Sequence, residues 1–386
     1  MSDYLIFSGD IPAAEWVNNR LTVLNKALLP LYLSHTADAD SWLVTRAIDA
    51  QRTHARRLKE VLRLDGRDDA STALYVNGAV ITDNYWVKPL DSALTYKQVR
   101  FTDDSFADLA LTGECSDSVI RAAASGTCRT PELTNIGSYE KCRRLIDGQW
   151  WLYKQADHDE QFSELFVYEF GCALGLDMAH YERVQGGVRT RDFTDGASVN
   201  FEPAAGFMGD NEDYNDVLAA LQEICPQAIP NYIRMIFLDA VTANPDRHTF
   251  NFGLLRDTVT GDLLGLAPLF DHNAALIARG YPSAPPKPDM LIRLFNDVMK
   301  EHPEYRQYVP VLTEQTVREV IDRIGMEVRT QAIVDMVVGR YALICLPSVE
   351  KFDVAATEAR EWAASVGYTE EDVNDIIKTV RERKRK

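Results

Sequence analysis

The sequence has no long apolar run and no secretory leader pattern. A membrane-spanning helix needs about 18 or more consecutive apolar residues, and no stretch of the 386-residue chain provides them. The N-terminus, MSDYLIFSGDIPAAEW, shows no basic region followed by a long apolar segment, which a secretory signal requires. A cytoplasmic protein without membrane association is therefore expected.

Cysteine and histidine are infrequent and dispersed. The six cysteines form no Cys-x-x-Cys pair and no tight cluster with the seven histidines, so a structural zinc site is not expected. We interpret the cysteines as reduced and mostly packed thiols. They are Cys115, Cys128, Cys142, Cys172, Cys225 and Cys345.

Basic residues are fewer than acidic residues. The chain has 41 Lys and Arg residues against 58 Asp and Glu residues, a formal net charge of −17. A charge of this sign disfavours non-specific attraction to phosphate backbones and anionic membranes, so no direct nucleic-acid partner is expected. With 46% hydrophobic and 26% charged residues, the composition is that of an ordinary globular protein.

Composition and periodicity divide the chain into three segments. Residues 1–120 mix strand-like pieces such as YLIF with helical stretches near 39–64, and we predict an α/β accessory region of unknown role. Residues 121–205 read as strands around one helix, and residues 206–386 as largely helical. The predicted fold class is α+β, with a small β-rich lobe followed by a larger helical lobe.

The second segment predicts a hairpin followed by a helix. Residues 142–155 form two strand-like runs joined through Asp147-Gly148, a dipeptide suited to a tight turn with positive φ. A helix is expected from about 160 to 174, with Gly175 placed to end it.

A lysine on the second of these strands is the first candidate for chemistry. Lys154 alternates onto the same face as Trp150 and Leu152. Such a lysine either extends to solvent or pairs with a carboxylate inside a site. Glu164 and Glu169 of the following helix are both candidates. Periodicity does not choose, because Glu169 lies near the centre of the apolar stripe and Glu164 on the opposite side.

The segment LDAVTANPDRHTFNFGLL at 238–255 carries the strongest chemical pattern. A helix should stop before Asn244-Pro245, which leaves Asp246 to Asn251 as a loop leading into a strand. Protein kinases place their catalytic base and a metal-binding Asn five residues apart, as here. The spacing alone is expected by chance about once in a chain of this length.

A second carboxylate strengthens this interpretation. A hairpin, FGLLRD to LLGLAPLF, is predicted to return the chain beside Asn251 with its second strand ending at Asp271. Phosphoryl transfer needs one carboxylate at the attacking hydroxyl, and an amide oxygen with a second carboxylate to hold Mg²⁺ against nucleotide phosphates. Asp271 alone would sooner be a helix or turn cap, but with Asp246 and Asn251 it favours a metal pair. His248 is expected to orient the loop rather than act as a base.

A phosphate-covering loop is expected before the lysine strand. TNIGSYEK at 134–141 has one glycine there, but the chain has neither a Gly-x-Gly-x-x-Gly motif nor a Walker-type Gly-Lys-Ser/Thr. Taken by itself, the pattern therefore favours an ordinary loop.

With these residues placed, the chain resembles the HipA-like serine/threonine kinases, a bacterial branch of the protein-kinase superfamily often found in toxin–antitoxin systems. Asn244 to Gly253 is similar to that family's catalytic loop, N-x-D-x-H-x-x-N-x-G, and Pro268 to Asp271 to its metal-binding strand end. The match extends over about 131–280.

The resemblance implies an ATP- and Mg²⁺-dependent kinase with a two-lobed protein-kinase-like fold. Glu164, eleven residues before Gly175, has the spacing of the family's helix glutamate, which favours it as the partner of Lys154. Thr134 would occupy the position of a serine that such kinases autophosphorylate. The residues implied in catalysis are Asp246, Lys154, Glu164 and His248, those in nucleotide binding are Gly137, Ser138, Lys141, Lys154, Asn251 and Asp271, and those in metal binding are Asn251 and Asp271.

Three functions stay open at this point. The first is a kinase acting on a protein hydroxyl. The second is a small-molecule or lipid kinase, because Asp-Arg-His-x-x-Asn also resembles the loop of phosphoinositide kinases. The third is a non-catalytic nucleotide-binding module. Residues 1–120 do not resemble the family's short N-terminal subdomain, so the sequence does not support an antitoxin-like partner.

Overall fold

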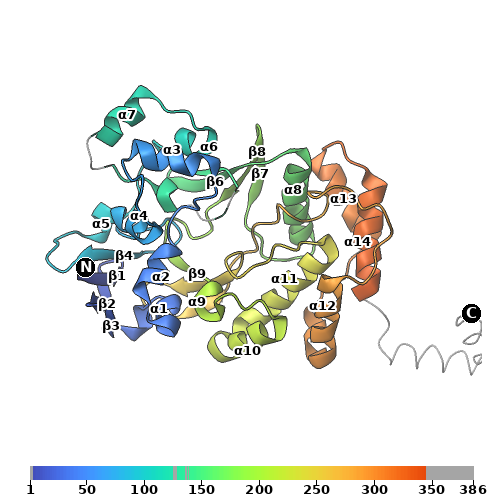
Figure 1. The fold of residues 1–386 in the computed structure, drawn as a ribbon. Helices are drawn as coiled ribbons and strands as arrows, with labels where there is room; N and C mark the ends of the chain where they lie inside the picture. The colour runs from blue at the N-terminus through green and yellow to red at the C-terminus, as the bar shows by residue number, and fades with distance from the viewer. Residues whose placement is uncertain (1–2, 125–127, 135–136, 138, 345–386) are drawn as a thin grey trace, which may run out of the picture. The chain divides into compact units, whose positions relative to one another are not determined.

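Antiparallel sheets organise the fold (Figure 1). The computed structural model describes residues 3–124, 128–134, 137 and 139–344, and within these the strands form three sheets, all with antiparallel pairing. The chain divides into one unit over Met1–Arg340 and a second over Tyr341–Lys386, and the three sheets belong to the first. The mixture of sheets and helices confirms the predicted α+β fold class.

The N-terminal region is built on a four-stranded sheet with the order β3-β2-β1-β4. Successive residues of a strand point to opposite faces of a sheet, and both faces of this sheet carry buried apolar side chains. Ile6 packs in a cluster with Trp42, whereas its neighbour Phe7 packs in a second cluster with Trp86. The strands are β1 (Tyr4–Ser8), β2 (Ile11–Val17), β3 (Arg20–Val23) and β4 (Tyr85–Pro89).

Short helices follow strands β3 and β4 in the chain. The helical stretch predicted near 39–64 is divided into α2 and α3, and α7 lies inside a run rich in Ser, Thr and Gly. The helices are η1 (Lys26–Leu28), α1 (Leu31–Thr36), α2 (Ala39–Val44), α3 (Thr53–Val61), α4 (Asp69–Tyr75), α5 (Tyr96–Val99), α6 (Ala107–Thr112), α7 (Asp117–Ala124) and η2 (Pro131–Thr134).

The second sheet has the order β5-β6-β8-β7 and carries the predicted hairpin. Asp147 and Gly148 have φ values of 49° and 78°, as a two-residue hairpin turn requires, so this prediction is confirmed. Helix α8 begins with a capping box at Asp157 and Glu160, and Gly175 follows its end with φ 73°. The elements are β5 (Lys141–Ile146), β6 (Gln149–Gln155), α8 (His158–Ala173), β7 (Tyr181–Val184) and β8 (Gly187–Arg191).

The third sheet, β11-β10-β9, lies among the remaining helices. The sequence predicted the hairpin formed by β10 and β11, but it did not predict β9, the third strand of the sheet. Gly253 meets β9 so closely that an added Cβ would lie 2.2 Å from the Glu202 carbonyl oxygen. The elements are β9 (Val199–Pro203), α9 (Ala205–Met208), α10 (Tyr214–Ile224), η3 (Pro226–Ala228), α11 (Ile229–Thr242), β10 (Gly253–Asp257), β11 (Leu263–Leu266), α12 (Met290–Glu301), η4 (Pro303–Tyr308), α13 (Glu314–Ile324) and α14 (Thr330–Ile344).

Strand β11, the second strand of the predicted hairpin, is shorter than predicted. It ends at Leu266 rather than at Asp271. The following segment changes partner, because Leu269 N–H donates to the Asp177 carbonyl and the Leu269 carbonyl accepts from Ala179 N–H, both at 2.9 Å. The chain thus reaches Asp271 after pairing with the segment before β7.

A buried ionic network joins the N-terminal region to the third sheet. Glu202, on β9, is 4% exposed and accepts hydrogen bonds from Tyr85 Oη at 2.6 Å and Leu31 N–H at 3.1 Å. Arg256, on β10, donates to Glu202 at 2.9 Å and to the Leu29 carbonyl at 2.7 Å. The start of α1 and strand β4 are therefore fixed to β9 and β10.

The N-terminal region is also bonded to the second sheet. Ile48 N–H donates to the Leu133 carbonyl at 2.7 Å, and Thr53 N–H donates to the Glu140 carboxylate at 2.6 Å. Arg52 donates to the Lys141 carbonyl. Residues 1–124 thus contact both sheets that follow them in the chain.

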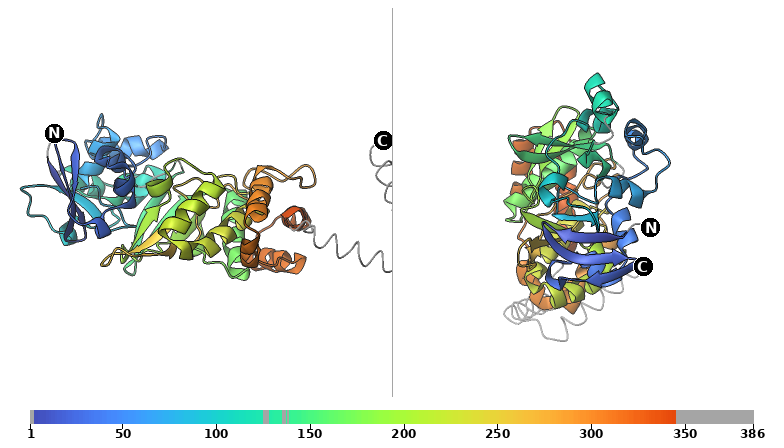
Figure 2. Two further views of the ribbon diagram at one scale, coloured as in Figure 1. Left: turned by 90° about the horizontal axis from the view of Figure 1, so that it is seen from below. Right: turned by 90° about the vertical axis from the view of Figure 1, so that its left-hand side faces the viewer.

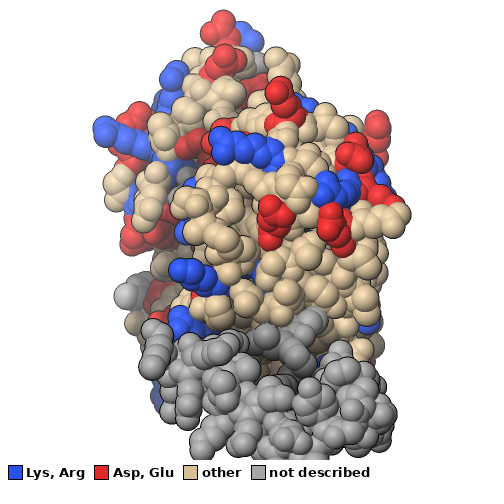
Figure 3. All heavy atoms as spheres, turned by 90° about the vertical axis from the view of Figure 1, so that its right-hand side faces the viewer, with Lys and Arg blue, Asp and Glu red and all other residues tan. Residues whose placement is uncertain are grey.

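Helices α10 and α11 lie between the N-terminal elements and α12 and α13 (Figure 2). None of the helices in the described part of the chain is long and apolar enough to cross a membrane. On the face drawn in Figure 3, basic and acidic side chains are intermingled over a largely uncharged surface.

Removing Glu202 should destabilise the fold. We expect Glu202→Ala to lower the free energy of unfolding by about 3 to 5 kcal/mol, because it leaves the buried Arg256 without its carboxylate. Urea unfolding followed by circular dichroism measures the change. Glu60→Ala is the matched control, since Glu60 and its partner Arg56 are largely exposed, and it should cost less than about 0.5 kcal/mol. Equal effects of the two variants would contradict this account.

Candidate active site

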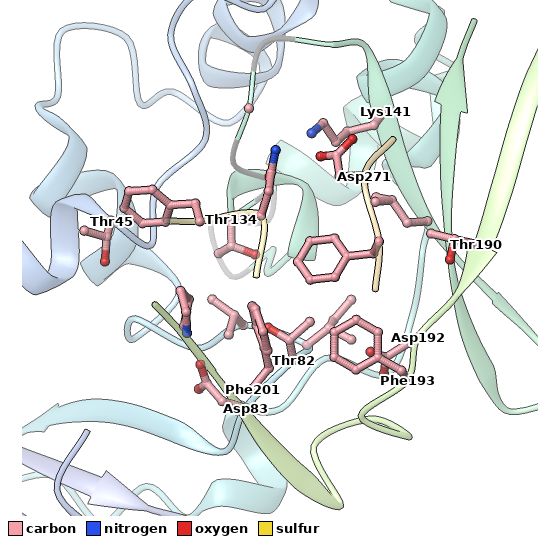
Figure 4. A pocket seen from close by; sticks show the side chains of 18 of the residues that line it. Thr45, Thr82, Asp83, Thr134, Lys141, Thr190, Asp192, Phe193, Phe201 and Asp271 are labelled. Carbon is pink, nitrogen blue, oxygen red and sulfur yellow. The ribbon is translucent and has the colours of Figure 1, made fainter. Parts of the chain in front are cut away.

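A cavity of about 270 Å³ gathers most of the residues singled out in the sequence (Figure 4). It is lined by the second sheet, the loop after α11, the segment at 270–273 and part of the N-terminal region. Glu164 lies behind Lys154 rather than on the lining, and Ser138 lies outside the described residues. The predicted site residues on the lining are Gly137, Lys141, Lys154, Asp246, His248, Asn251 and Asp271.

Lys154 is held between two carboxylates. Its Nζ atom donates to Glu164 Oε1 at 3.0 Å and to Asp271 Oδ1 at 2.6 Å. The side chain is 5% exposed. Burial lowers the pKa of Lys154, but the charges of Asp271 and Glu164 outweigh it and raise the pKa well above its ordinary value. The lysine therefore carries a permanent positive charge in the cavity.

The structure distinguishes the two helix glutamates. Glu164 is fully buried against Lys154, and its Oε2 atom accepts a hydrogen bond from His272 N–H at 3.0 Å. Burial raises the pKa of Glu164 and Lys154 opposes that effect. Glu169 instead pairs with Arg323 at 2.8 Å. Periodicity could not choose because α8 buries more than one face, including Val167 on the side of Glu164.

Asp271 has an unusual backbone conformation. Its φ is 60°, in the left-handed region that few residues other than glycine adopt, although Asp tolerates it better than most. Its N–H donates to Tyr181 Oη at 3.0 Å, which helps to fix this conformation. Burial alone would raise the pKa of Asp271, but Lys154 and Lys141 hold it below its ordinary value. The residue is thus an ionised carboxylate at neutral pH.

The loop after α11 has the predicted course. The helix ends at Thr242, and Ala243 follows with φ 53°. Asn251 Nδ2 donates to the Asp246 carbonyl at 2.9 Å, which leaves Oδ1 as the amide atom suited to a cation. His248 Nδ1 accepts from Phe250 N–H at 3.2 Å, so its ring is bonded within the loop.

Arg247 was missed as a functional residue in the sequence. It is 7% exposed and binds Asp239 of α11 through both arms of its guanidinium, at 2.8 and 2.9 Å. Its Nη1 atom also donates at 2.7 Å to the carbonyls of Asn251 and Phe270. The signal was Asp239, the sole carboxylate in an apolar helix, since such a group is rarely buried without a partner.

His272 contacts both Arg247 and Glu164, the partner of Lys154. Arg247 Nη2 lies 3.0 Å from His272 Nδ1, so the imidazole accepts there and carries its proton on Nε2. Burial, followed by the charge of Arg247, lowers the pKa of His272 well below its ordinary value. Residues 270–272 are therefore held from one side by Arg247 and from the other by Glu164.

The predicted phosphate loop meets the same cavity. Gly137 has φ 92°, and a Cβ atom there would lie 2.8 Å from Lys141 Nζ, so a side chain would displace this lysine. Burial lowers the pKa of Lys141 to about 7. Thr134 lines the cavity and donates from Oγ1 to the Pro131 carbonyl at 2.7 Å.

Two parts of the lining were not predicted. One is aromatic: the rings of Phe193, Phe201 and Phe270 lie 5.5 Å apart, centroid to centroid, beside the connection from β8 to β9. The other comes from residues 1–120 and includes Tyr32 and Thr45. Neither part has a local sequence pattern, because each is assembled from segments distant in the chain.

The donor set fits a Mg²⁺ ion held partly by a nucleotide. In the described residues no three His, Cys, Asp or Glu side chains gather as a metal site of their own. The amide oxygen of Asn251 and the ionised carboxylate of Asp271 are the hard oxygen ligands that Mg²⁺ prefers. Mg²⁺ commonly takes its other ligands from water and substrate phosphates.

A family model matches the part of the chain that carries most of the candidate site. The model of the family described as HipA-like C-terminal domain matches residues 137–332, just over half of the chain. The chain therefore belongs to the HipA-like family, and at the level of that family it is a HipA-type kinase. The resemblance predicted from the catalytic-loop motif is confirmed.

Two solved structures are similar to the chain. One is the proinflammatory kinase CtkA of Helicobacter pylori, with 18% identity and a TM-score of 0.41, covering 58% of this chain and 95% of its own. The other is HipA of Shewanella oneidensis MR-1, from a toxin–antitoxin complex with HipB and operator DNA, with 12% identity and a TM-score of 0.45, covering 89% of this chain and 100% of its own. Likenesses this low carry no information on activity. No curated protein matches the chain.

Replacing Arg247 should destabilise the fold around the loop after α11. We expect Arg247→Met to lower the free energy of unfolding by about 3 to 5 kcal/mol, because the buried carboxylate charge of Asp239 then keeps its hydrogen bond from Asn244 but loses its cationic partner. Chemical denaturation measures the loss. Adding Asp239→Asn to Arg247→Met removes that charge and should restore part of it. A double variant no more stable than the single one would contradict the pairing.

Glu132, on η2, should make stability depend on pH. It is fully buried, accepts from Arg143 N–H at 2.7 Å, and burial raises its pKa to about 7. The folded state then binds more protons than the unfolded state, so the stability from protonated Glu132 is complete below about pH 4.5 and lost as the pH rises through 7. The stability of the wild type relative to Glu132→Gln should therefore fall by roughly 2 to 3 kcal/mol between pH 5 and 8. Denaturation at both pH values checks the sign, and a rise would refute it.

Proposed function

We propose that the protein is a serine/threonine kinase that transfers the γ-phosphate of ATP to a polypeptide hydroxyl. The observation that supports this proposal is Lys154, held between Glu164 and Asp271 at a cavity that Asp246 and Asn251 also line. Kinases require this combination of a lysine paired to a helix glutamate, a base and two metal ligands. The family supplies the general kind of enzyme, and the acceptor class is our proposal.

In the proposed reaction each side chain has one task. Lys154 presents its charge to the phosphate oxygens, and Glu164 keeps it in place. Asp246 accepts the proton of the acceptor hydroxyl as its oxygen bonds to the γ-phosphorus and the bond to the bridging oxygen breaks. Mg²⁺, held by Asn251 and Asp271 when bound, would neutralise charge on the phosphates.

Support for the loop comes from two neighbouring residues. His248 is bonded to the backbone of Phe250 and would orient the loop rather than take the proton. Arg247 holds the carbonyl of Asn251 and that of Phe270, the residue before Asp271. Both proposed metal ligands are thus positioned by one guanidinium group.

We further propose autophosphorylation within the phosphate loop. Thr134 lines the cavity, and its hydroxyl is bonded to the Pro131 carbonyl, so it would have to rotate toward Asp246 to react. Ser138 is the second candidate, although it lies outside the described residues. A cytoplasmic location and an antitoxin-like partner stay predictions; the Shewanella HipA structure contains HipB, but its likeness to this chain is too low to argue for a partner.

Removing the base should abolish transfer. We expect Asp246→Ala to lower phosphate transfer from γ-labelled ATP by about 100- to 10,000-fold, because the carboxylate proposed to take the hydroxyl proton is then missing. Label on the protein and release of ADP are measured together, with Mg²⁺ present. Asp262→Ala, which changes an exposed aspartate in the turn after β10, is the control and should be fully active.

The same assay separates the other functions. Full activity of Asp246→Ala would refute the proposal. Label that appears only on added small molecules would indicate a small-molecule or lipid kinase. Thermal stabilisation by ATP and Mg²⁺ without any turnover would indicate a nucleotide-binding module.

A further inference from the structure

Residues 1–120, to which the sequence attached no chemistry, form one wall of the cavity. Tyr32 of α1, Trp42 of α2 and Thr45 after α2 all lie on the lining; Tyr32 and Thr45 are half-buried, and Trp42 is 3% exposed. Figure 4 shows Thr45 facing the same space as Thr134. We call Tyr32, Trp42 and Thr45 the N-terminal wall.

The N-terminal wall stands beside the catalytic loop. Helix α1 packs on α9 so closely that a Cβ atom on Gly206 would lie 3.2 Å from Tyr32 N. The start of α9 is in turn bonded to the loop, because Ala205 N–H donates to the Thr249 carbonyl at 2.9 Å. Asp246 lines the same cavity. The wall therefore flanks any hydroxyl that reaches Asp246.

The wall is held rigidly. Its α1 end is fixed by Glu202, which accepts from Leu31 N–H at 3.1 Å. Its α2 end is fixed by Arg46, whose guanidinium lies 4.6 Å from the centre of the Trp42 ring and donates to Asp83 at 2.7 and 2.9 Å. An arriving substrate would have to break buried ion pairs to displace it.

The wall is also electrically neutral. Arg46 and Asp83 lie on the lining beside the wall, and Arg46, which is 6% exposed, is neutralised by its two-point contact with Asp83. The groups that the wall presents are aromatic rings and a hydroxyl. Apart from the paired Arg46, the cationic residues on the described lining all belong to the second sheet, so the wall itself offers no cation to an acceptor; they are Lys141, Arg143, Lys154 and Arg191.

We infer that the N-terminal wall is part of the acceptor site and selects a Ser or Thr hydroxyl on an extended peptide segment with an uncharged residue beside it. This inference rests on the proposed kinase function. A folded surface cannot follow the wall into the cavity, whereas an extended segment can pass along it. Tyr32 and Thr45 then contact the side chain next to the acceptor.

A degenerate peptide library with a fixed central Ser or Thr tests the inference. With γ-labelled ATP and Mg²⁺, the wild-type protein should prefer uncharged residues at one position near the acceptor. Tyr32→Ala should flatten that preference and raise KM for the best peptide about tenfold, which corresponds to about 1.4 kcal/mol of lost contact energy. KM for ATP should stay unchanged. Tyr4→Ala, in β1 and away from the cavity, is the matched control and should behave as wild type.

A gain of specificity separates recognition from mere structural support. Thr45→Arg places a cation on the wall, so the library should now show selection for Asp or Glu at the same position. A damaged fold would lower all rates without creating a new preference. Unchanged selectivity in both Tyr32→Ala and Thr45→Arg would overturn the inference.

Two further results would overturn the acceptor class. One is label on glycerol or inositol with none on any library peptide. The other is equal labelling of native ribonuclease and of its reduced, alkylated form, which have one sequence in folded and unfolded states. Self-labelling that is lost in Asp246→Ala would still support the kinase function after either result, so the two failures can be told apart.

Discussion

The buried contact of Lys154 with Glu164 and Asp271 is the interaction on which the candidate site depends. Lys154 and Glu164 are removed from water together, and each charge would be strongly unfavourable there without the other, whereas Asp271 stays partly exposed at the cavity. The contact joins strand β6 and helix α8, which are neighbours in the chain, to the segment after β11, which follows more than a hundred residues later. Its geometry can form only when all three elements are packed, so the site and the tertiary fold are acquired together.

A second charged group completes this arrangement. Arg247 connects α11, the catalytic loop and residues 270–272, and the last of these also bonds Glu164. The two networks therefore share one short segment, in which Asp271 has a left-handed backbone conformation. Strain of this kind persists where surrounding contacts determine it fully. Here the segment is held by an arginine on one side and a glutamate on the other.

Local sequence signals predicted the elements well and the contacts between them less well. The Asp147-Gly148 turn and the end of α11 depend on backbone preferences of a few residues, and both were found where predicted. The choice of Glu164, the strand β9 and the change of partner after Leu266 depend on packing between distant segments. The roles assigned to Asp246, Asn251 and Asp271 came from spacing and family resemblance, and they stay predictions. Arg247 and the N-terminal wall were missed because no short pattern encodes them.

The attachment of residues 1–124 has a consequence for what counts as a module in this protein. The family model begins at residue 137, yet Ile48, Thr53 and Tyr85 bond to Leu133, Glu140 and Glu202 on or next to that domain. Cutting the chain at the family boundary would leave Glu202 and Arg256 without the groups that complete their burial. The segment that the family model matches is thus shorter than the compact unit, which also includes residues 1–124.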